Sequence, residues 1–188
     1  MNDPILTQRL RLDPPSPADL DALADIFAMP EVCTYLGDGS PRSRAHIETS
    51  LAKRIDCLAA HGVSIWTVRA RVGLPATDTA PAIPAGAVVG DCGVIPVAWH
   101  GPEFELLYRL HPHAWGRGIA TEAATAACER ADRVGINPLI GLAYEGNAAS
   151  RRVLTRVGFE PRGETDRWYG VTLRWFERVG QWGMGNRQ

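Results

Sequence analysis

The fold is decided by one stretch, Leu106-Leu-Tyr-Arg-Leu110-His-Pro-His-Ala-Trp115-Gly-Arg-Gly118-Ile-Ala-Thr-Glu122. Its apolar start is broken by Pro112 and gives way to glycines at positions 116 and 118. Apolar residues then recur at helical spacing as far as Ala131. This pattern predicts a strand, a turn and a helix, and it places any chemistry at the turn.

The predicted turn has the properties of an anion-binding site. Glycine lets the backbone adopt conformations closed to other residues, and the first turn of a helix leaves several N–H groups unpaired. Such groups hold a phosphate at the positive end of the helix dipole. The alternative is an ordinary tight turn. Two familiar phosphate loops do not match, because Thr121 replaces the third glycine of the dinucleotide motif and no Gly-Lys-Ser/Thr follows.

A second stretch, Asn147-Ala-Ala-Ser150-Arg-Arg-Val-Leu154-Thr-Arg-Val-Gly158-Phe159, follows the first. Together with Glu105-Leu-Leu-Tyr108 and the glycine turn, it resembles the GNAT acetyltransferase superfamily. The resemblance is strongest to the RimJ/RimL-like branch, which contains acetyltransferases of ribosomal-protein N-termini. The opening Leu6-Thr-Gln-Arg-Leu-Arg-Leu12 is similar to the first strand of that branch, so the resemblance runs from about residue 6 to about residue 179.

Length and composition indicate one domain over residues 1–188, with a core of about 6–179. The chain has 188 residues, of which 45% are hydrophobic, which is enough for one sizeable core. The 20 Lys and Arg nearly balance the 21 Asp and Glu, so we expect no nucleic acid or membrane partner. The N-terminus lacks an export signal and no apolar run is long enough to cross a bilayer, which favours a cytoplasmic protein.

Cysteine and histidine give little sign of a metal or disulfide framework. The four cysteines have no paired spacing, which favours reduced, buried thiols. His111 and His113 form a pair without a recognisable third ligand, so we expect no metal.

Periodicity and turn residues predict an α/β layered (α+β) fold in the order strand, two helices, three strands, helix, strand, helix, two strands. The resemblance implies the GNAT acyl-CoA N-acyltransferase fold, a mixed, mostly antiparallel sheet of about seven strands with about four helices. In that fold the fourth strand, which holds Glu105, splays from the fifth, at 139–144, and admits the pantetheine arm of acetyl-CoA. We expect a long exposed loop at 74–84 and a frayed glycine-rich tail after Val179.

The resemblance implies a cofactor site around the glycine turn. Main-chain N–H groups from about Trp115 to Ala120 would hold the pyrophosphate, and the thioester would lie beside the strand that ends near Leu110. Asn147 would orient the pantetheine amide or cap its helix. The superfamily commonly has Gln or Arg where this chain has His113, which puts a side-chain contact there in doubt. The expected cofactor-binding residues are Leu110, His113, Trp115, Gly116, Arg117, Gly118, Ile119, Ala120, Asn147 and Ser150.

Two residues match catalytic positions of the resembling branch. Glu105 corresponds to an acid proposed as the base that deprotonates the acceptor ammonium, directly or through water. Its alternative is a surface carboxylate on a strand. Ser150 corresponds to a residue near the sulfur that donates a hydrogen bond to the leaving thiolate, and its alternative is an ordinary first-turn serine. Tyr35, Tyr108 and Tyr169 are candidates for the acceptor groove, although aromatic residues in strands often belong to the core.

These expectations favour an acetyl-CoA-dependent N-acetyltransferase, without a metal, that acts by direct attack in a ternary complex on a primary amine. The resembling branch favours the α-amino group of a protein or peptide N-terminus. A small-molecule amine, such as an antibiotic or polyamine, is the first alternative. A catalytically silent acyl-CoA-binding domain is the second, since Leu107 stands where the branch usually has Gly. The protein would be a monomer or homodimer.

Overall fold

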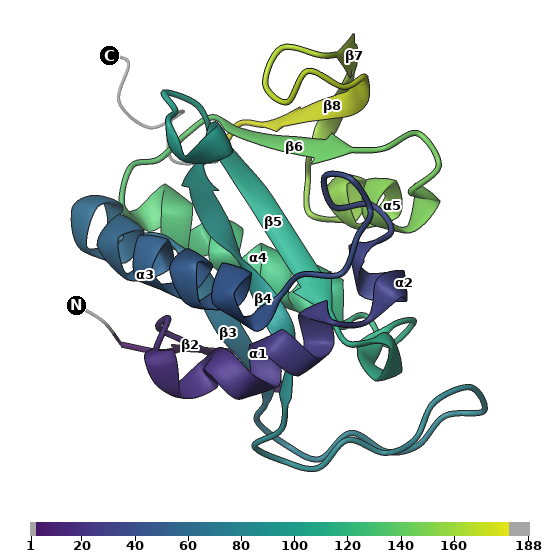
Figure 1. Ribbon diagram of the computed structural model, residues 1–188. Helices are drawn as coiled ribbons and strands as arrows, with labels where there is room; N and C mark the ends of the chain where they lie inside the picture. Colours follow the sequence, from purple (N-terminus) through teal and green to yellow (C-terminus); the bar gives the residue numbers. More distant parts are fainter. Residues whose placement is uncertain (1–2, 181–188) are drawn as a thin grey trace.

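The computed structural model describes residues 3–180, and Figure 1 shows a twisted sheet with helices on both faces. The strands are β1 (Ile5–Leu6), β2 (Leu10–Asp13), β3 (Ile65–Ala70), β4 (Val88–Pro96), β5 (Phe104–Leu110), β6 (Leu139–Ala143), β7 (Glu160–Thr165) and β8 (Leu173–Arg178). The α-helices are α1 (Leu20–Phe27), α2 (Pro30–Cys33), α3 (Arg44–His61), α4 (Ile119–Arg133) and α5 (Ala148–Arg156). The tail expected to fray lies outside the described residues from position 181 onwards.

The eight strands lie in the order β1-β2-β3-β4-β5-β6-β8-β7. β4 and β5 are antiparallel and pair along the whole of β5, from Pro96–Phe104 to Gly90–Leu110. β5 and β6 are parallel and pair through Phe104–Leu139 and Glu105–Ile140, after which the two strands diverge (Figure 1). This divergence confirms the expected splay between the strand of Glu105 and the strand that follows it in the sheet.

The edge strand β1 was not expected as a separate element. Residues 6–13 read as one strand in the sequence, but Ile5 and Leu6 turn back and pair with Leu12 and Arg11. The hydroxyl of Thr7 accepts a hydrogen bond from the backbone N–H of Leu10 at 2.9 Å, which closes the turn between them. The sheet therefore has eight strands where the sequence predicts about seven.

Two layers of helix complete the core. α4 packs on β4 and β5 through small residues, among them Ala123, Ala124 and Ala127, each fully buried. α1 and α3 cover the opposite face. Ile47, Leu51, Ile55 and Leu58 recur at helical spacing in the sequence, which predicts that Ile55 lies on the buried face of α3. That prediction is wrong, because Ile55 is 39% exposed whereas Arg54 is 1% exposed. The inward face of α3 follows Ile47, Leu51, Arg54 and Leu58, which fits the 3.6-residue period.

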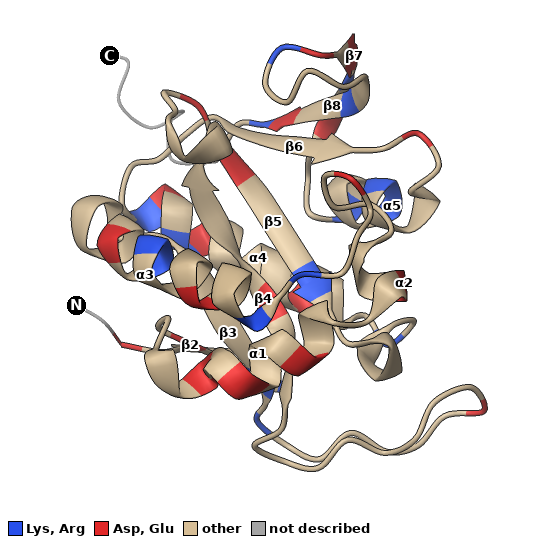
Figure 2. Ribbon diagram, in the orientation of Figure 1, with Lys and Arg blue, Asp and Glu red and all other residues tan. Residues whose placement is uncertain are grey.

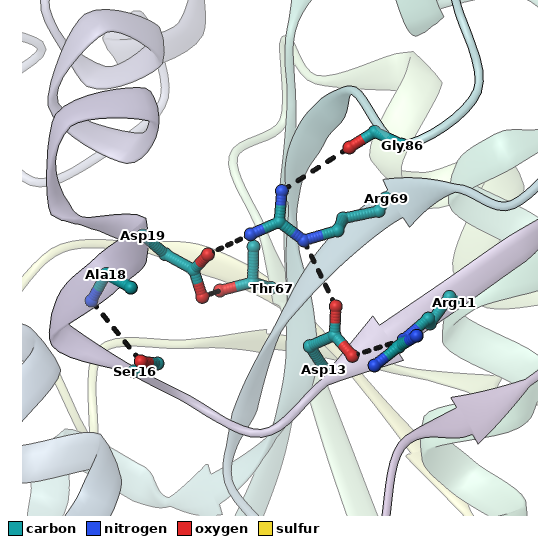
Figure 3. A network of polar contacts seen from close by, with 8 residues as sticks. All are labelled: Arg11, Asp13, Ser16, Ala18, Asp19, Thr67, Arg69 and Gly86. Atoms are coloured by element: carbon teal, nitrogen blue, oxygen red, sulfur yellow. Dashed lines mark hydrogen bonds and ion pairs between the residues drawn. The ribbon is translucent and has the colours of Figure 1, made fainter.

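A buried polar network fixes the start of α1 against the sheet (Figure 3). Asp19 lies at the end of the short 3-10 helix η1 (Pro17–Asp19) and is 3% exposed. Its carboxylate accepts a hydrogen bond from Thr67 at 2.8 Å and pairs with Arg69, which also reaches Asp13. Ser16 caps the turn by accepting from the N–H of Ala18. Because α1 is anchored this way, its far end reaches the cavity described below.

The loop at 74–84 is exposed and extended, as expected, and projects from the body as an arm (Figure 1). Isolated bridges between Leu74 and Ile83 and between Thr77 and Ala80 keep its two sides together. The guanidinium of Arg117 donates to the carbonyl oxygens of Pro75 and Pro81. The arm is therefore tied to the glycine turn. Within residues 3–180, none of the helices has the length and apolar character needed to cross a membrane.

Candidate active site

One cavity of about 1170 Å³ opens between the diverging strands, the glycine turn and the helices α1 to α3. Its volume exceeds that of a typical ligand pocket, about 300–1000 Å³, so it has room for two substrates. Most residues selected from the sequence lie in its walls: Tyr35, Glu105, Tyr108, Leu110, Trp115, Gly116, Gly118, Ile119, Ala120, Asn147, Ser150 and Tyr169. Among the residues that the structure describes, His113 and Arg117 do not line it.

The glycine turn connects β5 to α4 through a 3-10 helix, η3 (Pro112–Ala114). Gly116 and Gly118 have φ values of 72° and 74°, which L side chains rarely adopt. Gly118 caps α4, and within residues 3–180 no side chain caps that end of the helix. The N–H groups of the first turn therefore remain available for a ligand.

The acidic residue of that first turn is held away from the cradle. Glu122 accepts hydrogen bonds from the hydroxyl of Thr7 at 2.5 Å and from the backbone N–H of Arg9 at 2.8 Å, and pairs with the guanidinium of Arg9 at 2.7 Å. Burial opposes its ionisation, but these hydrogen bonds dominate and lower its pKa. Its negative charge is thereby neutralised on the β1–β2 side of the helix, so it does not compete for the N–H groups.

The side chains of the turn differ in their relation to the cavity: Trp115 lines it, whereas His113 and Arg117 do not. Arg117 points to the arm at 74–84, as described above. The imidazole of His113 lies 4.4 Å from that of His111, whose Nδ1 accepts from the N–H of His113. Trp115 is 47% exposed and donates from its indole N–H to the carbonyl of Leu110 at 2.8 Å. The cofactor assignment rests on main-chain N–H groups at the turn and left a side-chain contact of His113 in doubt, and neither His113 nor Arg117 lines the cavity. Trp115 anchors the turn on the end of β5.

Glu105 is not a surface carboxylate, since it is 1% exposed. Burial raises its pKa to about 7, although hydrogen bonds from Tyr169 and from the N–H of Ala98 and the charge of Arg109 oppose the rise. The hydroxyl of Tyr169, on the β7–β8 connection, donates to Oε1 of Glu105 and accepts from the N–H of Ala98 at 3.2 Å. A carboxyl with this pKa exchanges protons readily near neutral pH.

Ser150 and Tyr108 meet across the splay. Their hydroxyl oxygens are 2.8 Å apart, and the hydroxyl of Tyr108 also donates to the carbonyl of Ser150 at 3.0 Å. Asn147 caps α5, because its Oδ1 accepts from the N–H of Ser150 at 3.0 Å. Burial raises the pKa of Tyr108 well above its ordinary value. The hydroxyl of Tyr108 therefore stays protonated and uses its hydrogen on the carbonyl of Ser150, while the hydroxyl of Ser150 is the donor left at the cavity wall.

Tyr35 closes another side of the cavity. It follows the short helix α2, and its exposed fraction is 41%. Its hydroxyl donates to the carbonyl of Gly146 at 3.1 Å, and its ring lies 6.0 Å from that of Tyr144. The tyrosine thus joins the α2–α3 connection to the start of α5, and it does not merely cover the edge of the core.

A buried ion cluster in the same cavity was missed by the sequence analysis. Asp91 is fully buried and binds Arg109 through Nε at 2.8 Å and Arg54 through Nη2 at 3.0 Å. Both arginines line the cavity. One sequence feature could have predicted the burial of Arg54, because this residue lies at the helical spacing of Ile47 and Leu51 in α3. Charged residues are mostly found at the surface, however, so the spacing alone did not indicate burial.

Comparisons with known proteins are consistent with this geometry. A family model described as an acetyltransferase (GNAT) domain matches residues 9–160. No curated protein is similar enough to count as a match. Within residues 3–180, no group of three His, Cys, Asp or Glu could hold a metal ion.

Several solved structures share the fold. An acetyltransferase from Agrobacterium tumefaciens str. C58 superposes with a TM-score of 0.73 at 24% identity, covering 94% of each chain. A Salmonella typhimurium acetyltransferase that modifies the N-terminal serine of ribosomal protein L7/L12 gives a TM-score of 0.73 at 14% identity, covering 95% of this chain and 99% of that one. RimL, a ribosomal L7/L12 α-N-protein acetyltransferase in complex with coenzyme A, gives a TM-score of 0.72 at 16% identity, covering 94% of this chain and 98% of that one.

Proposed function

Since the chain belongs to the GNAT acetyltransferase family, whose members are acyltransferases that use acetyl-CoA, we propose that it acetylates the α-amino group of a protein or peptide N-terminus. One observation carries this proposal. Glu105, a buried carboxyl with a pKa of about 7, lines the same cavity as the free N–H groups of the glycine turn. A base and an anion cradle at two ends of one strand suit an amine and a phosphorylated cofactor.

The cavity fits the cofactor on its own features. The N–H groups around Gly116 and Gly118 have no side-chain cap within the described chain and face a cavity that both glycines line. Acetyl-CoA supplies the acetyl group as a thioester. In our proposal the turn binds the pyrophosphate, and the unpaired edges of β5 and β6 orient the pantetheine arm.

The chain's own residues perform the remaining steps. Glu105 accepts a proton from the acceptor ammonium, so that the amine lone pair can attack the thioester carbonyl carbon. As the new C–N bond forms, the C–S bond breaks, and the hydroxyl of Ser150, held in place by Tyr108, donates a hydrogen bond to the departing thiolate. The nitrogen loses its second proton as the amide forms. The thiolate takes up one proton, from this nitrogen, from Glu105 or from solvent, and the other proton is released to solvent. We propose no covalent acyl-enzyme.

The pKa of Glu105 favours an α-amino group over the side chain of lysine. An α-ammonium has a pKa of about 8, and a lysine ammonium has one of about 10.4. Moving the proton to a carboxylate of pKa about 7 costs about 1 kcal/mol from the first and about 5 kcal/mol from the second. The base is therefore suited to an N-terminus.

The charges of the cavity disfavour a polyamine or aminoglycoside, which needs several acids around it. Its walls carry more arginine than acid: Arg42, Arg54, Arg109, Arg152 and Arg156 against Glu31, Asp38 and Glu105. A polycation would be repelled by this surplus.

A panel assay tests the proposal. Thiol release from acetyl-CoA is measured with peptides that have a free α-amine, with the same peptides blocked at the N-terminus but carrying lysine, and with polyamines. We expect turnover with the free α-amines. Turnover confined to polyamines would support the small-molecule alternative, and acetyl-CoA binding by calorimetry without turnover on any amine would support the silent domain.

A further inference from the structure

The cluster of Arg54, Asp91 and Arg109 has an unbalanced charge. Two guanidinium groups share one carboxylate, and the side chains of Arg54, Asp91 and Arg109 are 1%, 0% and 17% exposed. Burying a charge without a partner is unfavourable, so such groups are normally neutralised by a neighbour or a ligand. The cluster therefore retains one positive charge at the wall of the cavity.

Hydrogen-bond donors in the cluster are also unused. Arg54 donates from Nε to Ser50 at 3.1 Å and from Nη2 to Asp91. Its Nη1 is buried and has no hydrogen-bond partner within residues 3–180. Arg109 uses Nε and Nη2 on Asp91 and lays its guanidinium over the ring of Phe27, 5.0 Å from the centroid. Two parallel N–H groups of a guanidinium match a carboxylate.

Nearby acids are already engaged and do not neutralise the cluster. Asp19 is held by Arg69 and Thr67, as Figure 3 shows. Asp38 pairs with Arg42 at 2.8 Å. His46, which also lines the cavity, has its pKa lowered by burial and by the neighbouring arginines, which favours the neutral imidazole, and an imidazole cannot supply an anion. Glu105 senses the charge of Arg109, but its carboxylate forms no ion pair with either arginine. An anionic group of a ligand in the cavity could therefore balance the cluster.

The position of the cluster relative to Glu105 suggests which ligand. Glu105, Leu107 and Arg109 alternate along β5 and so share one face of it, and Figure 2 shows acidic and basic colour near opposite ends of this strand. Four residues of strand span about 13 Å. A peptide whose α-amine lies at Glu105 reaches the cluster with the side chain of one of its next few residues, since an extended chain advances about 3.3–3.6 Å per residue.

We propose that Arg54 and Arg109 bind an acidic side chain of the acceptor, so that the enzyme prefers protein N-termini with Asp or Glu at the second, third or fourth position. This preference rests on the proposed N-terminal acetylation and names its substrate class. The acceptor carboxylate would pair with the guanidinium of Arg109, which is 17% exposed, and would neutralise the positive charge that Arg54 adds to the cluster. Nη1 of Arg54 is itself buried, so a hydrogen bond from it requires a small movement of that side chain toward the cavity.

The test compares matched peptides that differ only by Glu or Gln at positions two, three and four. We expect the unaltered protein to show kcat/KM at least tenfold higher for Glu at one of these positions. Arg54→Met should bring the Glu/Gln ratio close to one. Because that variant leaves Asp91 with one partner fewer, Arg54→Lys serves as a second variant: it keeps the charge beside Asp91, loses the guanidinium fork, and should reduce the ratio severalfold.

The matched control is Arg44→Met on the same helix. Arg44 is 59% exposed, pairs with Asp21 at the surface, and should leave the ratio unchanged. Turnover of all peptides with a ratio near one at every position would overturn the preference while leaving N-terminal acetylation intact. Weaker acetyl-CoA binding in both Arg54 variants, with an unchanged ratio, would assign the anion to the cofactor and also overturn it. Turnover on none of the peptides would instead remove the proposed function on which it rests.

Discussion

At the scale of single residues, Glu105 is a carboxyl whose protonated form the fold favours. Its pKa is raised from 4.5 to about 7, mainly by burial. In the proposed mechanism the active form is the carboxylate, so kcat/KM should rise with pH and level off above about pH 7. Glu105→Gln should lower kcat by about 10²–10⁴-fold, the usual contribution of a general base, with acetyl-CoA affinity unchanged. A pH profile with no inflection near neutrality would contradict this role.

Ionisation of Glu105 should lower the free energy of unfolding. A carboxyl whose pKa is higher in the folded than in the unfolded chain stabilises the fold only while protonated, so this contribution disappears as the pH rises from about 4.5 to about 7. A shift of this size corresponds to about 3 kcal/mol. Glu105→Gln should therefore be more stable than the unaltered protein at pH 8 by up to that amount and nearly equal at pH 4.5. Denaturant unfolding at the two pH values measures the difference.

Tyr169 tunes this carboxyl from the β7–β8 connection. Its hydroxyl donates to Glu105, and this hydrogen bond opposes the rise in the pKa of Glu105. Tyr169→Phe should move the inflection of the pH profile to higher pH. Tyr144→Phe is the matched control, because the hydroxyl of Tyr144 donates to the carbonyl of Gly37 and leaves Glu105 untouched. An unchanged inflection in Tyr169→Phe would mean that the hydroxyl does not act on the base.

A separate prediction concerns the hydroxyl of Ser150. Its hydroxyl lies at the cavity wall, 2.8 Å from that of Tyr108. If it donates a hydrogen bond to the leaving thiolate, Ser150→Ala should lower kcat by about 10–10²-fold, since a hydrogen bond to a charged group is worth about 1.5–3 kcal/mol. Thr155→Val on the same helix is the control, because Thr155 only donates to the carbonyl of Arg151 at the surface. Equal losses in both variants would indicate a helix defect and no role at the sulfur.

At the scale of elements, substitutions of glycine allow the effect of backbone strain on stability to be measured separately from the effect on ligand binding at the turn. Gly116 has a φ of 72°, and a Cβ there would meet nothing within 4 Å among the described residues. Gly116→Ala should cost about 1–2 kcal/mol of stability from the left-handed backbone. It should also weaken acetyl-CoA binding about tenfold if the turn relaxes to avoid that strain.

Gly135 supplies the matched control for this substitution. It follows α4 with a φ of 80°, and within residues 3–180 its Cβ would also meet nothing within 4 Å. It is not among the cavity residues. Gly135→Ala should show the same loss of stability and unchanged acetyl-CoA affinity by calorimetry. Equal affinities in the two variants would remove the turn from the proposed cofactor site.

At the scale of the whole molecule, the sequence predicted the fold where periodicity and turn chemistry agree. The alternation around β2, the apolar face of α4 and the capping residue Asn147 each led to an element that the structure contains. The divergence of β5 from β6 was predicted correctly because the resemblance to the GNAT family implies it. The extra edge strand was missed because a single hydroxyl, that of Thr7, decides the turn before β2.

The site was predicted less completely, because sequence fixes main-chain conformation better than side-chain direction. Glycines at 116 and 118 predict the cradle, but the direction of the Arg117 side chain depends on the arm at 74–84, which is distant in the chain. The burial of Arg54 depends on Asp91, 37 positions later. Pairing across such a distance follows from sheet register and helix placement, which composition and spacing do not give.

The divergence of β5 from β6 has a consequence for how the molecule holds together. Phe104–Leu139 and Glu105–Ile140 are the pairs that join the two strands, so β6, β7 and β8 are coupled to the larger half by few ladder bonds. A thiol-bearing arm with its own amides, inserted between the strands, would act as a bridging strand. Amide hydrogen exchange in β6 and β8 should therefore slow severalfold when coenzyme A is added, while exchange in β3 and β4 stays constant. The bound cofactor would then stabilise the contact between the two halves of the sheet, in addition to its part in the reaction, so that the halves unfold as one cooperative unit.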